Sequence, residues 1–160
     1  KGGLYEGGHR VPFIARWPNH VPAGVVNESA VIGGVDLLPT LAAIGKAKLP
    51  DDESDGEDIS HALFGEGFTR GKPLMWEYGR NETVFKYPGN AADRSPQLAM
   101  RDGKFKLLVN SDGSQLELYD LAADPREKTN VAKEQAVVMA RFREYLLEWK
   151  RNLPKFVAQP

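Results

Sequence analysis

The stretch QLAMRDGKFKLLV, residues 97–109, predicts a β-hairpin. Two largely apolar runs flank Asp102 and Gly103, and an Asp-Gly pair between two such runs is a strong signal for a tight turn. PLMWEY at residues 73–78 precedes the hairpin, and LELYDL at 116–121 follows it with alternating apolar and polar residues. Both segments are typical of strands. Together the four segments predict a four-stranded antiparallel sheet.

A long amphipathic helix is predicted after the strands. At the 3.6-residue spacing of a helix, one apolar face is formed by Val138, Phe142, Tyr145, Leu146, Trp149 and Leu153. Because an antiparallel sheet with one open face needs cover, we expect this helix to pack on the sheet. A turn at residues 122–130 precedes the helix, and Thr129 or Asn130 is a candidate N-cap. The predicted fold class is therefore α+β.

The first half of the chain contains signals for one strand and two helices. Residues 11–15 are apolar without alternation, which predicts a short buried strand with cover on both faces. DLLPTLAAIG at 36–45 predicts a helix with Asp36 as N-cap and Gly45 as the stop. Residues 58–65 predict one or two further helical turns after an acidic loop.

Composition and charge exclude several classes of protein. The chain has 160 residues, of which 41% are hydrophobic and 27% charged, as in an ordinary globular domain. A net charge of -1 and the lack of a basic cluster disfavour nucleic acid and membrane surfaces as partners. Zero cysteines exclude disulfides, thiolate metal ligands and a cysteine nucleophile. No apolar run approaches the ~20 residues of a membrane span.

The familiar motifs of self-contained active sites do not match. The glycine-rich opening KGGLYEGGHR, residues 1–10, lacks the Lys-Ser/Thr ending of a phosphate-binding loop and the GxGxxG spacing. The acidic run from Asp51 has Ala62 where a calcium loop needs a bidentate Glu. The three histidines form no metal-binding pattern, and no serine lies in GxSxG. A complete catalytic apparatus within this chain is therefore not expected.

Five stretches, in order along the chain, resemble the C-terminal third of the type I sulfatases, the arylsulfatase-like branch of the alkaline phosphatase superfamily. They are KGGLYEGGHRVPFIARWP, VDLLPTLAAIG, DGEDISHALFG, LAMRDGKFKLL and LYDLAADPREKTNVA. They cover most of the chain, and the main unmatched part lies between Trp76 and Pro96. The resemblance implies a parent enzyme that hydrolyses sulfate esters.

The resemblance also implies a domain organisation and cofactors. Residues 1–46 would be the last strand and helix of a large α/β sulfatase domain, 47–72 a linker with an acidic loop and short helix, and 73–160 the C-terminal subdomain. The family uses calcium and a formylglycine made from the Cys or Ser of a CxPxR-like motif. This chain contains neither that motif nor an early aspartate pair, so the partner that supplies them would be a missing N-terminal sulfatase domain.

The resemblance assigns a catalytic role to Lys1. This residue aligns with the family lysine that precedes YEGG and binds the sulfate group of the substrate. An ammonium there can stabilise negative charge on the sulfuryl oxygens or on the leaving oxygen. Glu6 and Arg10 also match the family, and we interpret them as a structural pair that braces the turn.

Three further residues are candidates for substrate binding. His9 lies in the same glycine-rich turn as Lys1. Glu77 and Arg80 lie where a predicted strand enters the unmatched loop at 79–96, and loops on a rigid frame often carry substrate-reading residues. Metal ligands are not expected in this chain.

Three hypotheses follow. In the first, the chain is the C-terminal part of a sulfatase, is inactive alone and, by family resemblance, is periplasmic or secreted. In the second, it belongs to a phosphodiesterase or phosphonate hydrolase of the same superfamily. A set of ligands for two metal ions in the preceding sequence would distinguish such an enzyme from a sulfatase with a single calcium site. In the third, it is a non-catalytic interaction module that folds stably alone. The first hypothesis predicts that residues 4–46 expose apolar surface when the large domain is absent.

Overall fold

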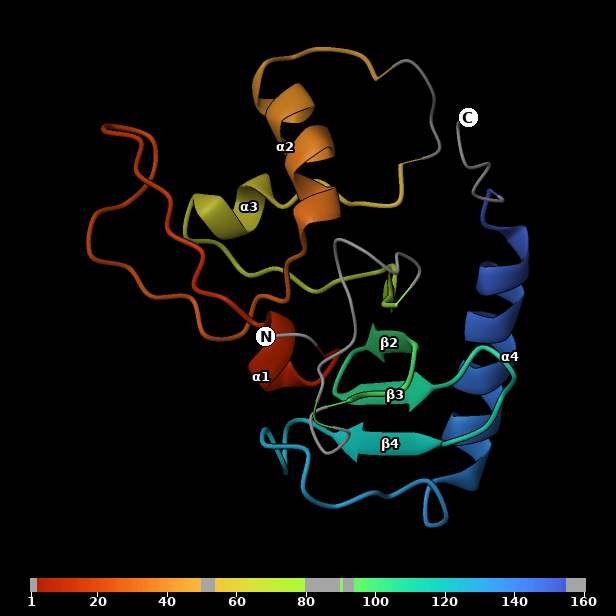
Figure 1. Ribbon diagram of the computed structural model, residues 1–160. Helices are drawn as coiled ribbons and strands as arrows, with labels where there is room; N and C mark the ends of the chain where they lie inside the picture. The colour runs from red at the N-terminus through yellow and green to blue at the C-terminus, as the bar shows by residue number, and fades with distance from the viewer. Residues whose placement is uncertain (1–2, 50–53, 80–89, 91–93, 155–160) are drawn as a thin grey trace. The chain divides into compact units, whose positions relative to one another are not determined.

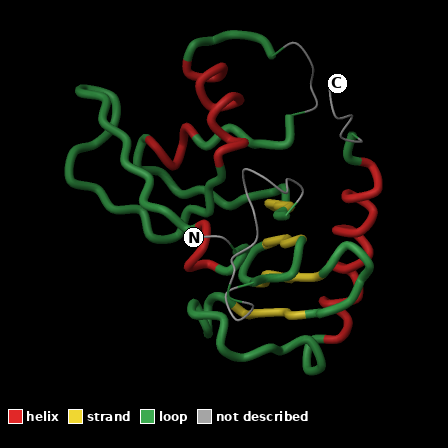
Figure 2. Tube along the Cα trace, in the orientation of Figure 1, coloured by secondary structure: helices red, strands yellow, loops and turns green. Residues whose placement is uncertain are grey.

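The computed structural model describes residues 3–49, 54–79, 90 and 94–154. Figures 1 and 2 show the elements in place along the chain. In order they are α1 (Glu6–His9), η1 (Gly34–Asp36), α2 (Leu37–Ile44), α3 (Ser60–Leu63), β1 (Leu74–Glu77), β2 (Leu98–Asp102), β3 (Phe105–Val109), β4 (Glu117–Asp120) and α4 (Ala136–Asn152). The chain divides into two compact units, one formed by Lys1–Arg10 with Met75–Pro160 and the other by Val11–Leu74.

The predicted four-stranded antiparallel sheet is confirmed, with the strand order β1-β2-β3-β4. In the central hairpin Asp102 pairs with Phe105, so the turn consists of Gly103 and Lys104, and Asp102 is the last residue of its strand. Gly103 has a φ of +56°, which a two-residue hairpin turn requires and which glycine adopts without strain. The turn thus lies one residue later than the sequence predicts.

Helix α4 covers one face of the sheet, as predicted (Figure 1). The core between them is formed by Leu98, Met100, Leu107, Val109, Leu118, Phe142 and Leu146. Tyr145 was predicted on the same apolar face, but its side chain is 49% exposed. Tyr145 lies about 100° from Leu146 around the helix, which turns its ring away from the sheet.

The cap predicted for α4 is wrong. The helix begins at Ala136, and its N-cap residue, Gln135, makes no side-chain capping bond. Asn130 instead accepts hydrogen bonds from the backbone N–H groups of Leu118 and Ala132, both at 3.0 Å. Its amide also donates to the carbonyl of Leu116 at 3.0 Å. Asn130 therefore fixes the segment between β4 and α4 against β4, and it does not cap the helix.

The second face of the sheet is also covered, and the sequence did not predict by what. Because side chains alternate along a strand, Ala99 and Leu108 point away from α4. A second apolar cluster forms there, made of Leu4, Ala99, Leu108, Tyr119 and Leu121. Leu4 is only 5% exposed, so the N-terminal segment packs on this face. The sheet therefore has a core on both sides.

The unit Val11–Leu74 contains α2 and α3 within the predicted ranges. Asp36 and Gly45 flank α2 at the predicted N-cap and C-cap positions, but the side chain of Asp36 makes no capping hydrogen bond. Its carboxylate is fully buried and binds Arg70 in a bidentate pair, with N–O distances of 2.6 and 2.8 Å. It also accepts from the backbone N–H of Gly33 at 2.7 Å and of Glu57 at 2.9 Å. This pair joins η1 to the segment after α3.

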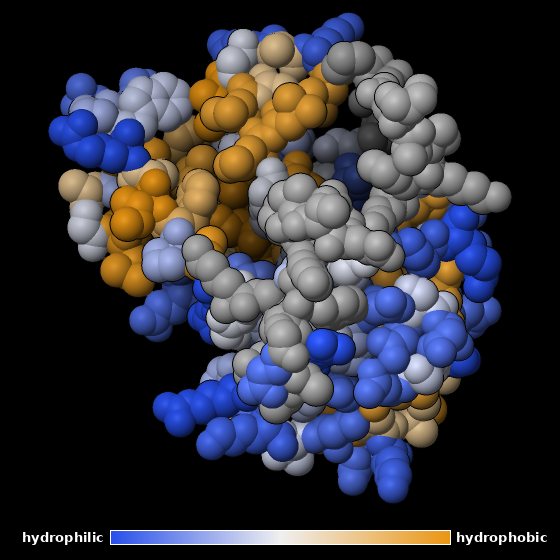
Figure 3. Space-filling model, viewed as in Figure 1, coloured by the Kyte–Doolittle hydropathy of each residue, from blue (hydrophilic) through white to orange (hydrophobic). Residues whose placement is uncertain are grey.

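The strand predicted at residues 11–15 is absent from this structure, where these residues are irregular. Val11 is 70% exposed and Ile14 is 88% exposed. A strand forms only against a neighbour, and no described segment pairs with this one. Large apolar side chains are exposed over the same unit, namely Val11, Phe13, Ile14, Trp17, Val25, Val26, Val35, Leu37, Leu38 and Leu41 (Figure 3). In the part of the chain that the structure describes, no helix is long and apolar enough to cross a membrane.

Candidate functional site

The glycine-rich turn that carries the candidate residues folds back on itself. α1 is a single turn, and a side chain on Gly8 would bring its Cβ within 2.1 Å of the backbone oxygen of Gly3. Only glycine permits that approach. The backbone N–H of Leu4 donates to Ser95 Oγ at 2.7 Å, which fixes the start of the turn on the sheet unit.

A buried ionic cluster lies beneath this turn. We call it the Lys106 cluster and define it as Glu6, Arg101, Lys106 and Glu127. Lys106 is fully buried, and its Nζ lies 2.9 Å from Glu6 Oε1 and 2.8 Å from Glu127 Oε1. The backbone N–H of Glu6 donates to Glu127 Oε2 at 2.5 Å. Glu6 is therefore held through both its side chain and its backbone.

Cations surround the Glu6 carboxylate. Arg101 Nη1 lies 3.7 Å from its Oε2, and Arg10 Nη1 lies 4.0 Å from the same oxygen. Burial is the largest single influence on the pKa of Glu6 and raises it, but the charge and hydrogen bond of Lys106, with the charges of Arg101 and His9, together bring that pKa below its usual value. The predicted pair of Glu6 with Arg10 is present, but Arg10 is 68% exposed and Lys106 is the closer partner.

The sequence reasoning missed Lys106, although one signal for it exists. Lys106 is a charged residue inside a strand whose other members are Phe105, Leu107, Leu108 and Val109. Strand alternation places its side chain on the same face as Leu108, the face that the N-terminal segment covers. A lysine in such a position needs a buried carboxylate partner. That partner, Glu6, lies 100 positions away along the chain.

His9 lies at the edge of the Lys106 cluster. Its ring centre is 4.8 Å from that of Trp76, and its Nδ1 is 3.0 Å from the backbone oxygen of Tyr5. Burial lowers the pKa of the His9 imidazole, and the nearby Lys106 ammonium lowers it further. The ring is therefore neutral at pH 7 and can both donate and accept a hydrogen bond.

Glu77 lies on the other face of the sheet. Its side chain is 14% exposed and pairs with Lys150 of α4. Because Trp76 and Glu77 are neighbours in β1, their side chains point to opposite faces, and Trp76 is on the face that His9 contacts. The structure thus brings His9 and Glu6 together but not His9 and Glu77. Lys1 and Arg80 lie outside the described residues.

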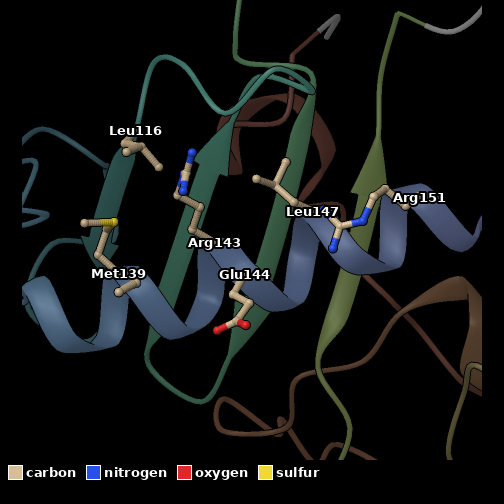
Figure 4. Close-up of a pocket in the computed structure, with 7 residues that line it drawn as sticks. Leu116, Met139, Arg143, Glu144, Leu147 and Arg151 are labelled. Carbon is tan, nitrogen blue, oxygen red and sulfur yellow. The ribbon is translucent and has the colours of Figure 1, made fainter.

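A separate hollow of about 500 Å³ lies along α4 (Figure 4). It is lined by Leu116, Met139, Ala140, Arg143, Glu144, Leu147 and Arg151. None of these is a predicted site residue.

Within residues 3–49, 54–79, 90 and 94–154, no three acidic or histidine side chains lie close enough together to hold a metal ion. The described residues therefore do not fit a calcium site.

Comparison with known proteins gives consistent matches. The family model described as "N-sulphoglucosamine sulphohydrolase, C-terminal" matches residues 1–152. Human arylsulfatase A is 34% identical over 152 residues, which cover 82% of this chain and 28% of that protein. The N-acetylgalactosamine-6-O-sulfatase of Bacteroides thetaiotaomicron is 31% identical over 147 residues, covering 91% of this chain and 28% of that protein.

A solved structure also matches. The structure of a 2-O GAG sulfatase superposes with a TM-score of 0.54 and 26% identity, covering 74% of this chain and 26% of that chain. In each case the matched region is a small part of the other protein. The 160 residues span just over a quarter of the length of the two relatives named above.

Proposed function

This chain belongs to the sulfatases, as a C-terminal region of that family, and from this premise we propose that it is part of an enzyme that hydrolyses sulfate esters. The observation that carries the proposal is the match of a sulfatase family model over residues 1–152, which includes the turn with Lys1 and His9. The matched share of the relatives supports a longer parent with a preceding sulfatase domain.

In this proposal Lys1 binds the sulfate group. Its ammonium stabilises the negative charge that develops on the sulfuryl oxygens or on the leaving oxygen as the S–O bond breaks. The residues that follow it support the role, because Leu4 and Glu6 are anchored in the sheet unit and provide a fixed base for the turn.

The nucleophile and the metal would come from outside this chain. The family resemblance implies a formylglycine that attacks sulfur and a calcium ion that supports it. No group among the described residues fits that ion, and the chain has no CxPxR-like motif. We therefore expect the 160 residues alone to be inactive towards sulfate esters.

His9, Glu77 and Arg80 are proposed to contact the part of the substrate beyond the sulfate. A neutral His9 beside Trp76 suits a hydroxyl-bearing leaving group, because the ring can donate or accept and the indole offers an apolar face. Glu77 lies on the α4 face of the sheet and pairs with Lys150, so a substrate that reaches it must displace that ion pair and would contact it separately from His9.

The experiment compares the 160-residue chain with the full-length protein that contains it, using an aryl sulfate with calcium present. We expect turnover only by the full-length protein, and we expect Lys1→Ala to lower its kcat/KM by about 100-fold or more. Lys133→Ala is the matched control, because Lys133 is an exposed lysine of the same chain.

Two results would contradict the proposal. Preferred turnover of a phosphonate monoester or a phosphodiester would assign the parent to another reaction of the superfamily. An inactive full-length protein carrying an intact formylglycine would favour an interaction module. Cell fractionation tests the proposed periplasmic or secreted location, which rests on family resemblance alone.

A further inference from the structure

Arg101 lies directly opposite another cation in the sheet. It pairs with Lys106 across the hairpin of β2 and β3, and strand alternation puts both side chains on the face that Leu4 covers. Like charges directly opposite one another in a sheet repel and lower its stability. For Lys106 this cost is offset by the carboxylates of Glu6 and Glu127, which lie 2.9 and 2.8 Å from its Nζ.

Arg101 has no comparable partner. Its Nη1 lies 3.7 Å from Glu6 Oε2, which is too far for a hydrogen bond. In the part of the chain that the structure describes, the Arg101 guanidinium donates no hydrogen bond, and its Nε is buried without a partner. Burial lowers the pKa of this guanidinium, and the nearby carboxylates of Glu6 and Glu127 do not restore it. Because the side chain is still 22% exposed, a ligand can reach the unused donors.

Two groups of the glycine-rich turn lie around the same carboxylate. Arg10 Nη1 is 4.0 Å from Glu6 Oε2 and its side chain is 68% exposed, and His9 Nε2 is 3.8 Å from Glu6 Oε1. The Lys106 cluster contains two cations and two carboxylates, so the charge of Arg10 is in excess while His9 is neutral. The exposed side of the cluster therefore suits an anion.

We propose that Arg101, together with Arg10 and His9, binds a carboxylate or sulfate group on the part of the substrate beyond the ester that is cleaved. This inference rests on the proposed function. A guanidinium binds either oxyanion through two parallel N–H donors, and a neutral imidazole can donate one more hydrogen bond. The partly buried indole of Trp76, 4.8 Å from the His9 ring, offers an apolar face to the sugar ring that carries the anion. The substrate class is therefore a sulfated acidic saccharide.

A purely structural role for Arg101 makes a different prediction. If its contact with Glu6 stabilised the fold, Arg101→Gln would lower the thermal midpoint and would reduce the turnover of every substrate alike. An Arg101 that is kept for an anion behaves otherwise. Its removal relieves the repulsion with Lys106, so the thermal midpoint should not fall.

The test uses the full-length protein and three sulfated disaccharides that differ in one group on the sugar next to the cleaved ester. That group is a carboxylate, a hydroxymethyl or a sulfated hydroxymethyl. We expect wild type to prefer a charged substrate over the neutral one by about 10-fold or more in kcat/KM. Arg101→Gln should lower that preference about 10-fold. The charged substrate that is preferred identifies the anion.

Two further variants make the result specific to the site. Arg143→Gln is the matched control, because Arg143 is an exposed arginine on α4, and it should change the preference by less than about 2-fold. Arg10→Gln keeps the test decisive if Arg101→Gln does not fold, because Arg10 is mostly exposed. It should lower the preference about 3-fold.

Distinct outcomes separate the inference from its premise. Equal kcat/KM values of wild type for the three substrates, or equal losses for all three in Arg101→Gln, would overturn the anion site and leave the sulfatase function intact. Where wild type hydrolyses none of them, calorimetry with the sulfate-free acidic disaccharide decides. Binding that Arg101→Gln weakens about 10-fold supports the site, and binding that is absent or unchanged in that variant refutes it.

Discussion

Two buried charged groups, Asp36 and Lys106, organise the two units of this chain at the scale of single residues. Asp36 is fully buried and holds Arg70 by both oxygens, and Lys106 is fully buried between Glu6 and Glu127. Each joins segments that are far apart in the sequence. Breaking one partner of such a group leaves the other charge buried and unpaired.

Arg70→Met is expected to lower the free energy of unfolding by about 3 to 5 kcal/mol, because it leaves the Asp36 carboxylate buried without its ion-pair partner. Urea unfolding followed by fluorescence measures the change. Arg16→Met is the matched control, since Arg16 is exposed in the same unit, and it should change stability by less than about 0.5 kcal/mol. Similar effects of the two substitutions would refute a structural role for the buried pair.

Low pH is expected to lower the folding stability of the unit Val11–Leu74, because the Asp36 carboxylate becomes protonated. Burial alone raises the pKa of the Asp36 carboxyl, but hydrogen bonds from Arg70 and from the backbone N–H groups of Glu57 and Gly33 bring the pKa below its usual value. Because the folded pKa is below the unfolded value of about 3.9, the stabilisation is complete above about pH 4. It is lost as the pH falls through the folded pKa.

The measurement compares wild type with Asp36→Asn by urea unfolding at several pH values. The difference in stability should be constant from about pH 7 to pH 5 and shrink below about pH 4. A difference that is unchanged at the lowest pH would show that the Asp36 charge does not contribute.

At the scale of elements, α4 and the central hairpin behave as their patterns predict, while the segment at 11–15 does not. Helical periodicity and the Asp-Gly signal are local, and both elements find partners within the sheet unit. A buried strand is different, because its hydrogen bonds come from a neighbouring strand. No described segment pairs with residues 11–15, so the apolar run remains irregular and exposed.

Phe142 and Tyr145 lie on different sides of α4, so substitutions at the two positions test which side of the helix packs against the sheet. Phe142 is 1% exposed and Tyr145 is 49% exposed. Phe142→Ala should cost about 3 to 5 kcal/mol by loss of apolar burial and formation of a cavity. Tyr145→Ala should cost less than about 1 kcal/mol. Thermal unfolding of both variants measures this, and equal losses would contradict the orientation of the helix.

At the scale of the whole molecule, the unit Val11–Leu74 exposes the apolar side chains expected of a surface that another part of a larger protein covers (Figure 3). The expectation that exposure begins at residue 4 is wrong, because Leu4 is buried against the sheet. The exposed surface starts at Val11, where the second unit begins.

The exposed surface predicts that the 160-residue chain binds a dye specific for apolar surface and self-associates. Ile14→Asp should reduce both effects in the isolated chain, because Ile14 is 88% exposed. In the full-length protein the same substitution should destabilise, since a buried carboxylate without a partner is costly.

Val137→Asp is the matched control, because Val137 is 86% exposed on α4 of the other unit. It should leave dye binding and full-length stability nearly unchanged. Dye fluorescence, size-exclusion chromatography and thermal midpoints provide the readouts. A dye-silent, monomeric wild-type chain would favour a self-sufficient module.

The sheet, α4 and the helical turns of the first half could be predicted from the sequence, because their signals are periodicities, caps and turn residues within a few positions of one another. The resemblance to sulfatases rests on the same kind of information, namely short motifs in a fixed order. The division of the chain at residues 46 and 72, and the roles of Lys1, His9, Glu77 and Arg80, remain predictions.

Tertiary structure alone decided which charged residues meet. Glu6 binds Lys106 across 100 positions and Glu127 across 121, and Glu77 binds Lys150 across 73. No local pattern encodes such pairs, because a buried charge selects its partner by three-dimensional proximity and by the cost of remaining unpaired. Local sequence patterns were enough to predict the four strands of the sheet and the helix that covers it, and only the folded chain showed that the turn at residues 3–9 is held by Ser95, Lys106 and Glu127.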